Sequence, residues 1–133
     1  PAENTLKGFR SVGRCEQPDG LIDIFPTLIE LCGLKLPPQK LEGLSLVNSL
    51  IKPMKKTGRA IITTQGRGNH AVRSRRYRYI RYADGSEELY DHKTDSHEWN
   101  NLSDDPSLFK VKSELMNYLP KFNAKPVLIK RRK

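Results

Sequence analysis

Residues 69–102 have the sequence NHAVRSRRYRYIRYADGSEELYDHKTDSHEWNNL, and this stretch decides the fold. Short runs rich in tyrosine, valine and isoleucine are separated here by polar turns, which is typical of antiparallel strands. The pair Asp84-Gly85 favours a two-residue type I′ turn, in which both residues have positive φ. A polar loop with the single tryptophan, Trp99, follows. We predict strands near 70–74, 77–83 and 87–91.

Working outward, a β-branched run at 60–64 predicts one more strand ahead of a glycine-rich loop at 65–69. Residues 21–34, LIDIFPTLIELCGL, have the apolar spacing of an amphipathic helix, with Asp23 as a cap, Pro26 in the first turn and Gly33 at the end. The apolar positions of this helix are Leu21, Ile24, Phe25, Leu28, Leu31 and Cys32.

Two further helices are predicted. A short one covers 41–51, with its apolar side chains inward, and a longer one begins at Asp105, a good N-cap, followed by Pro106. The inward residues are Leu44, Val47, Leu50 and Ile51 in the first, and Leu108, Val111, Leu115 and Leu119 in the second. The fold class is therefore α+β, a short antiparallel sheet of about four strands packed by helices.

The bulk composition fits a folded domain with one modest core. The chain has 133 residues, of which 36% are hydrophobic and 29% charged. It contains no run of about 20 apolar residues, so we expect no membrane span, and no export leader is visible at its start. We divide it into a leading segment at 1–19, a folded part at 20–120 and a basic tail at 121–133.

The net charge of +9 is concentrated in two places, a run of arginines between 67 and 81 and the tail at 130–133. Such a patch attracts anions, such as nucleic acid, lipid headgroups or sulfated sugars. The alternative is a solvated face whose arginines pair with Glu87, Glu88 or other carboxylates. No nucleic-acid-binding signature matches, which disfavours nucleic acid as the partner.

The candidate binding residues are Arg67, His70 and Arg73. His70 follows the glycine-rich loop and is flanked by the two arginines, so the three side chains suit contact with an anion. A purely structural role for His70 is the alternative.

Other chemistry-bearing residues fit known motifs less well. His92 and His97 lie near carboxylates, but their spacing matches no metal-ligand pattern and favours a hydrogen-bonded turn. Cys15 and Cys32 match no zinc motif. We expect Cys32 to be a small core residue, and whether the two cysteines pair stays open. The sequence contains no nucleophile elbow, phosphate loop or dinucleotide fingerprint.

The order of these pieces resembles the C-terminal third of the formylglycine-dependent sulfatases, and within them the iduronate-2-sulfatase-like bacterial branch. The matching pieces are DIFPTLIELCGL in the first helix, EGLSL after it, and EELYDH followed by DSHEWNNL. The likeness runs from about residue 20 to residue 120. It implies the C-terminal subdomain of the alkaline-phosphatase-like sulfatase fold, a four-stranded antiparallel sheet with a terminal helix.

The resemblance places the chemistry elsewhere. Family members hydrolyse sulfate esters with a cysteine oxidised to formylglycine, within Cys-x-Pro-Ser-Arg, and with a calcium ion. Neither Cys15 nor Cys32 is followed by that motif. The resemblance therefore implies that formylglycine and calcium belong to an upstream domain, and we assign no catalytic or metal residue and no cofactor to this chain.

We therefore expect the C-terminal part of a sulfatase, inactive by itself, whose partner is the N-terminal catalytic domain. The resemblance implies that the loop 65–73 forms part of the rim of a pocket for a sulfated polyanion, such as a glycosaminoglycan, and that the helix at 21–32 packs on the missing domain. It also implies an exported protein, periplasmic or extracellular. The alternative is a free-standing basic module that binds nucleic acid or a polyanionic glycan.

Overall fold

The computed structural model describes residues 14–55 and 57–125. They form two compact units, which divide between Arg59 and Ala60. Most of the predicted leading segment and of the basic tail, including residues 130–133, lies outside the described residues. In the part of the chain that is described, no helix has the length and apolar character needed to cross a bilayer.

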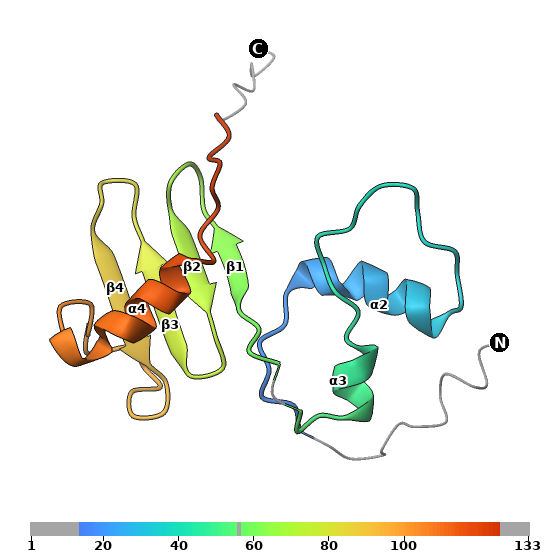
Figure 1. Cartoon of the computed structure of the whole chain (residues 1–133), viewed down its shortest axis with the longest axis horizontal. Helices are drawn as coiled ribbons and strands as arrows, with labels where there is room; N and C mark the ends of the chain where they lie inside the picture. The colour runs from blue at the N-terminus through green and yellow to red at the C-terminus, as the bar shows by residue number, and fades with distance from the viewer. Residues whose placement is uncertain (1–13, 56, 126–133) are drawn as a thin grey trace, which may run out of the picture. The chain divides into compact units, whose positions relative to one another are not determined.

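The second unit contains a four-stranded antiparallel sheet in the order β1-β2-β3-β4 (Figure 1). Each strand pairs with its neighbour in sequence, so the sheet is a simple meander. This confirms the predicted α+β class and sheet. The strands are β1 (Ile61–Thr64), β2 (His70–Arg73), β3 (Tyr77–Arg81) and β4 (Glu87–Asp91).

A C-terminal helix covers one face of the sheet (Figure 1). It comprises η2 (Pro106–Leu108) and α4 (Phe109–Met116), and the Asp105 carboxylate accepts a hydrogen bond from the backbone N–H of Ser107, as predicted for an N-cap. The core consists of Val72, Tyr79 and Leu89, which lie opposite one another across three strands, together with Leu115 of α4. The predicted apolar stripe of this helix is confirmed, because Leu108, Val111 and Leu119 pack against the same core.

The turn between β3 and β4 differs from the prediction. The N–H of Tyr82 donates to the carbonyl of Ser86 at 2.9 Å, and the N–H of Gly85 donates back to Tyr82 at 3.1 Å. Gly85 has a φ of +92°, but Asp84 does not have a positive φ. The Asp84 carboxylate instead accepts a bond from the N–H of Ser86 at 2.9 Å. The loop therefore has three residues with one left-handed glycine, and β3 ends before residue 83.

The first unit is helical. It contains η1 (Leu21–Asp23), α2 (Ile24–Leu31) and α3 (Val47–Ile51). Gly33 closes α2 just beyond its last residue, Leu31, as predicted, because Gly33 has a φ of +62°. The N–H of Leu34 donates to the carbonyl of Ile29 and that of Gly33 to Glu30, which is the Schellman arrangement.

Residues 41–46 do not form the first half of a helix, contrary to the prediction. Two side chains of the preceding helical segment accept hydrogen bonds from backbone N–H groups of residues 41–46. Asp23 accepts from Leu44 and Thr27 accepts from Leu46, each at 2.9 Å. Gly43 is buried so closely against the carbonyl of Ile22 that a Cβ would lie 1.9 Å from its oxygen. Helix α3 is therefore short, and of the predicted inward residues Val47 is buried while Leu44 and Leu50 are exposed.

Asp23 also differs from its predicted role as a helix cap. Its side chain is fully buried, forms an ion pair with Arg59, and accepts the N–H of Gly20 at 2.8 Å. It makes no capping bond to α2. It holds together three segments of the first unit instead.

The apolar stripe of η1 and α2 is exposed. The buried residues of this helical segment are Asp23, Pro26, Thr27 and Ile29. Cys32, predicted to lie in the core, is exposed, and both cysteines are free. The exposed apolar side chains are Leu21, which is 86% exposed, and Ile22, Ile24, Phe25 and Leu28, which are 50–55% exposed. Monomeric proteins rarely expose such a contiguous patch unless it binds something.

Candidate functional site

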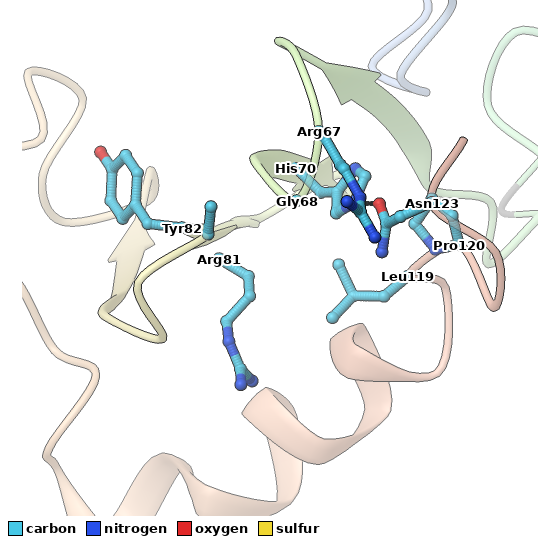
Figure 2. Close-up of a pocket in the computed structure, with 9 residues that line it drawn as sticks. Arg67, Gly68, His70, Arg81, Tyr82, Leu119, Pro120 and Asn123 are labelled. Carbon is cyan, nitrogen blue, oxygen red and sulfur yellow. Dashed lines mark hydrogen bonds between the residues drawn. The ribbon is translucent and has the colours of Figure 1, made fainter. Parts of the chain in front are cut away.

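An open pocket of about 610 Å³ lies at one end of the sheet (Figure 2). The loop between β1 and β2, the end of β3 and the segment after α4 form its walls. Leu119 and Pro120 supply an apolar side. The polar side chains that line it are Arg67, His70, Arg81, Tyr82 and Asn123.

His70 forms the buried part of this pocket. Only 5% of it is exposed. Its Nε2 atom lies 2.7 Å from Oδ1 of Asn123 (Figure 2). Its Nδ1 atom lies 2.9 Å from Oγ1 of Thr64. Because an amide oxygen only accepts, Nε2 carries the proton and Nδ1 accepts the Thr64 hydroxyl proton. Both ring nitrogens are engaged, so His70 ties β1 and β2 to the C-terminal segment.

The loop at 65–69 presents Arg67 to solvent. Gly66 and Gly68 have φ values of +68° and +83°, and Gly68 packs against Ala83 of the next turn. Asn69 fixes the same contact, since its side chain accepts the N–H of Ala83 at 3.0 Å. Arg67 is exposed and forms no hydrogen bond or ion pair with the described residues. Its guanidinium is therefore free to bind a ligand.

Arg81 belongs to a polar row that lies two residues along each strand from the core row, on the same face of the sheet. His70, Arg81 and Glu87 lie opposite one another on β2, β3 and β4. The Glu87 carboxylate accepts from Arg81 at 2.9 Å, from the Tyr79 hydroxyl at 2.7 Å and from Lys112 at 3.1 Å. The Tyr79 bond lowers the pKa of Glu87, with Lys112 and Arg81 adding to the effect against burial. Arg81 thus keeps its guanidinium beside the pocket with its charge largely offset.

The three predicted binding residues do not lie together. The structure brings Arg67 and His70 into one pocket, whereas Arg73 lies at the opposite end of β2. Arg73 is directly opposite Arg78 on β3 and does not line the pocket. A four-residue strand spans roughly 10 Å from its first to its last residue, which accounts for the separation.

Sequence reasoning did not place Arg81, Tyr82 or Asn123 in the site. Strand pairing was the available signal for Arg81, because a correct hairpin register puts it opposite His70. Asn123 follows Pro120, beyond the last predicted helix, and no motif marks it.

The two other histidines form local contacts. His92 Nε2 lies 2.6 Å from a Glu98 oxygen, and His97 stacks on Trp99 with ring centroids 5.0 Å apart. Among residues 14–55 and 57–125, no group of three potential ligands could hold a metal ion. The pocket is equipped for binding an anion through Arg67, and none of its lining residues pairs a nucleophile with a general base.

Comparisons with known proteins give a consistent result. Residues 16–125 match a family model described as "N-sulphoglucosamine sulphohydrolase, C-terminal". The chain is 41% identical over 114 residues to a protein of Formosa agariphila named "Sulfatase", in an alignment that covers 84% of this chain and 22% of that protein.

Two further matches have the same partial coverage. A "Delta 4,5-hexuronate-2-O-sulfatase" of Bacteroides thetaiotaomicron is 33% identical over 102 residues, which are 70% of this chain and 21% of that protein. A solved structure described as "a 2-O GAG sulfatase" has a TM-score of 0.60 at 31% identity, and the match covers 71% of this chain and 22% of that one. The chain therefore spans about a fifth of the length of these relatives.

Proposed function

The chain belongs to the family of N-sulphoglucosamine sulphohydrolase C-terminal domains, and on that premise we propose that it is the C-terminal part of a sulfatase acting on an anionic sulfated glycan. The observation that carries the proposal is the alignment itself. Most of this chain matches only about a fifth of each relative. The remaining part of such a protein is the proposed partner, an N-terminal catalytic domain.

The exposed apolar patch on η1 and α2 supports this partnership. Four of its side chains, Ile22, Ile24, Phe25 and Leu28, are each at least half exposed. Fully burying such a side chain contributes about 1.5–3 kcal/mol, and because these are already about half buried, docking would contribute about half of that for each. Docking of this patch on the catalytic domain would therefore supply a large driving force, and it would remove a surface that favours aggregation in water.

The catalytic groups of the proposed enzyme lie outside this chain. Cys15 is followed by Glu16-Gln17-Pro18 and Cys32 by Gly33-Leu34, so neither fits the Cys-x-Pro-Ser-Arg context in which formylglycine forms. The described residues also offer no ligand cluster for calcium. We assign no catalytic step to this chain.

The role proposed for this chain is to bind the substrate at the rim of the active site. Arg67 presents a planar fork of N–H donors, which matches the geometry of sulfate and carboxylate oxygens. His70 keeps the Arg67 loop in place through Thr64 and Asn123 rather than touching the substrate. Binding energy supplied at the rim would orient the sulfate ester toward the reacting group upstream.

The substrate class follows from the relatives. Two of them are named for removal of a 2-O-sulfate, one of them from a hexuronate. We propose a glycosaminoglycan fragment with a sulfated uronic acid, which carries both a carboxylate and a sulfate for the pocket. Because such glycans are extracellular polymers, we also propose that the protein is exported.

The test is sulfate release by the full protein, comprising this chain and its upstream part. Matched unsaturated disaccharides, with the sulfate either at the 2-position of the uronate or at the 6-position of the amino sugar, would be compared. We expect sulfate release, with the 2-O-sulfated compound the better substrate. Preference for the 6-O-sulfated compound would contradict the substrate class, and no release from any sulfated saccharide would contradict the function.

A free-standing basic module is the alternative function. The charge of +9 favours it, and so does Arg67, which has no partner among residues 14–55 and 57–125. Three other arginines of the basic run are neutralised by internal carboxylates, in the pairs Arg76–Asp91, Arg78–Glu98 and Arg81–Glu87. This pairing is what the solvated-face interpretation predicts for those residues. Heparin binding by this chain alone, with a steep salt dependence, would support the module.

A further inference from the structure

Arg73 lies on the face of the sheet that α4 does not cover. It follows Val72, whose side chain is in the core beneath α4, and successive side chains on a strand point to opposite faces. Arg78 lies directly opposite on the neighbouring strand and shares this face. Like charges placed opposite each other destabilise a sheet unless other groups compensate.

One nitrogen of Arg73 lacks a partner. Its Nη1 atom is buried from solvent and donates a hydrogen bond to no acceptor among the described residues. Burial lowers the pKa of the Arg73 guanidinium, Glu98 opposes this, and the charge of Arg78 lowers it further. A buried N–H donor without an acceptor costs free energy, and more so on a charged group.

The neighbouring carboxylates are already engaged. Glu98 receives two contacts from Nη1 of Arg78, at 2.8 and 3.1 Å, and one from His92 at 2.6 Å. It does so with a φ of +60°, a left-handed conformation that non-glycine residues rarely adopt. Glu88, which lies opposite Ile80 on the same face, accepts a hydrogen bond from the Tyr82 hydroxyl at 3.1 Å. Arg73 is thus a cation of this cluster without a carboxylate of its own.

We propose that this face of the sheet is a second surface for the upstream part of the protein, and that a carboxylate of that part binds Arg73. The inference rests on the proposed function for the existence of that partner. Two observations select it. The relatives are about five times longer than the matched region, so a large neighbouring domain is expected. The buried Nη1 of Arg73 has no acceptor among the described residues, and a carboxylate is the acceptor that suits a guanidinium best. This role replaces substrate binding as our hypothesis for Arg73.

The sign of a stability change tests the proposal. In the full protein, Arg73→Met would leave a buried carboxylate of the partner unpaired, and we expect the midpoint of thermal unfolding to fall by about 2–4 °C. Arg73→Lys keeps the charge and should lose less. If nothing pairs with Arg73, removing an uncompensated guanidinium beside Arg78 leaves the midpoint unchanged or raises it, which would overturn the proposal.

Crosslinking provides a readout that does not depend on stability. Photoreactive p-benzoylphenylalanine in place of Arg73 in the full protein should crosslink to a peptide of the upstream part. The same group in place of Lys110, an exposed cation of α4, serves as the control and should give no such product. Crosslinks confined to this chain, or a raised KM with an unchanged unfolding midpoint in Arg73→Met, would contradict the proposal. The unfolding and crosslinking readouts do not require sulfatase activity, so failure of the proposed function would be seen separately.

Discussion

The Nε2 atom of His70 on β2 lies 2.7 Å from Oδ1 of Asn123, 53 residues further along the chain. This bond fixes the segment after α4 against the end of the sheet, and the candidate pocket lies where the two meet. The position of Arg67 at the opening of the pocket therefore depends on a contact between residues that are distant in sequence.

Asn123→Ala should loosen the pocket, because it leaves the Nε2–H of His70 without its acceptor. We expect a loss of about 1 kcal/mol in stability, at the lower end of the range for a buried donor, since the open pocket lets water replace the amide. Thermal unfolding of the full protein measures it. Asn123→Asp keeps an acceptor oxygen and should preserve the midpoint. Equal losses in both variants would show that the bond is not what holds the segment.

Arg67→Ala should raise the KM for an anionic glycan about ten-fold and change kcat little. A hydrogen bond to a charged group contributes about 1.5–3 kcal/mol, which corresponds to a factor of ten or more in binding. Steady-state kinetics on the full protein separates the two constants. Lys110→Ala removes an exposed cation on α4 and should leave both unchanged. A normal KM in Arg67→Ala would argue against the pocket as a substrate site.

Alanine substitutions at two glycines of one loop should differ in effect. Gly66 and Gly68 both have positive φ, so either substitution costs about 1–2 kcal/mol in backbone conformation. A Cβ on Gly68 would also lie 3.1 Å from Cβ of Ala83, whereas a Cβ on Gly66 meets nothing within 4 Å. We therefore expect Gly68→Ala to destabilise the protein more and to raise the KM, as measured by denaturant unfolding and kinetics. Identical effects would show that the loop does not need to pack on the next turn.

The first unit should lose stability in acid through Asp23. Burial alone would raise the pKa of this carboxyl group, but hydrogen bonds from Arg59, Gly20 and Leu44 outweigh burial and lower it below 3.8. With a lowered folded-state pKa, the stabilisation is present above the unfolded value of about 3.9 and is lost as pH falls through the folded value.

The corresponding measurement is the hydrogen-exchange protection factor of the amides at residues 41–46 in the full protein. This protection factor, which is the intrinsic exchange rate divided by the observed rate, should fall below about pH 4. Asp23→Asn should lower it at neutral pH, at a cost of about 3–5 kcal/mol, because Arg59 is left without its partner. Asp19→Asn, at an exposed position, is the control. Protection that does not change between pH 7 and pH 3 would contradict the role assigned to Asp23.

The sheet was predictable because its determinants are local. Each strand is a short β-prone run bounded by glycine or polar turn residues, and all four were found within two residues of their ends. The position of the turn at Asp84-Gly85 was predicted correctly, but its type was not. The Asp84 carboxylate accepts the N–H of Ser86, and Asp84 does not adopt the positive φ that a type I′ turn requires.

The errors have long-range causes. Residues 41–46 were predicted helical from their leucine spacing, but Asp23 and Thr27 bind their N–H groups from about twenty residues away. The stripe on α2 was read correctly as apolar, yet apolar spacing does not reveal whether the covering surface belongs to the same chain. Arg67 and Arg73 lie apart, because Arg67 is in the loop before β2 and Arg73 is the last residue of that strand, away from the pocket.

Sulfate release from an aryl sulfate, compared between this chain alone and the full protein, tests the central claim most directly. We expect turnover by the full protein and none by residues 1–133, because we propose that the reacting aldehyde and the cation belong to the upstream part. Addition of that part to the isolated chain should restore activity if the two associate through the patch on η1 and α2. Turnover by the isolated chain, or a full protein that hydrolyses no sulfate ester, would contradict the assignment of this chain as the noncatalytic end of a sulfatase.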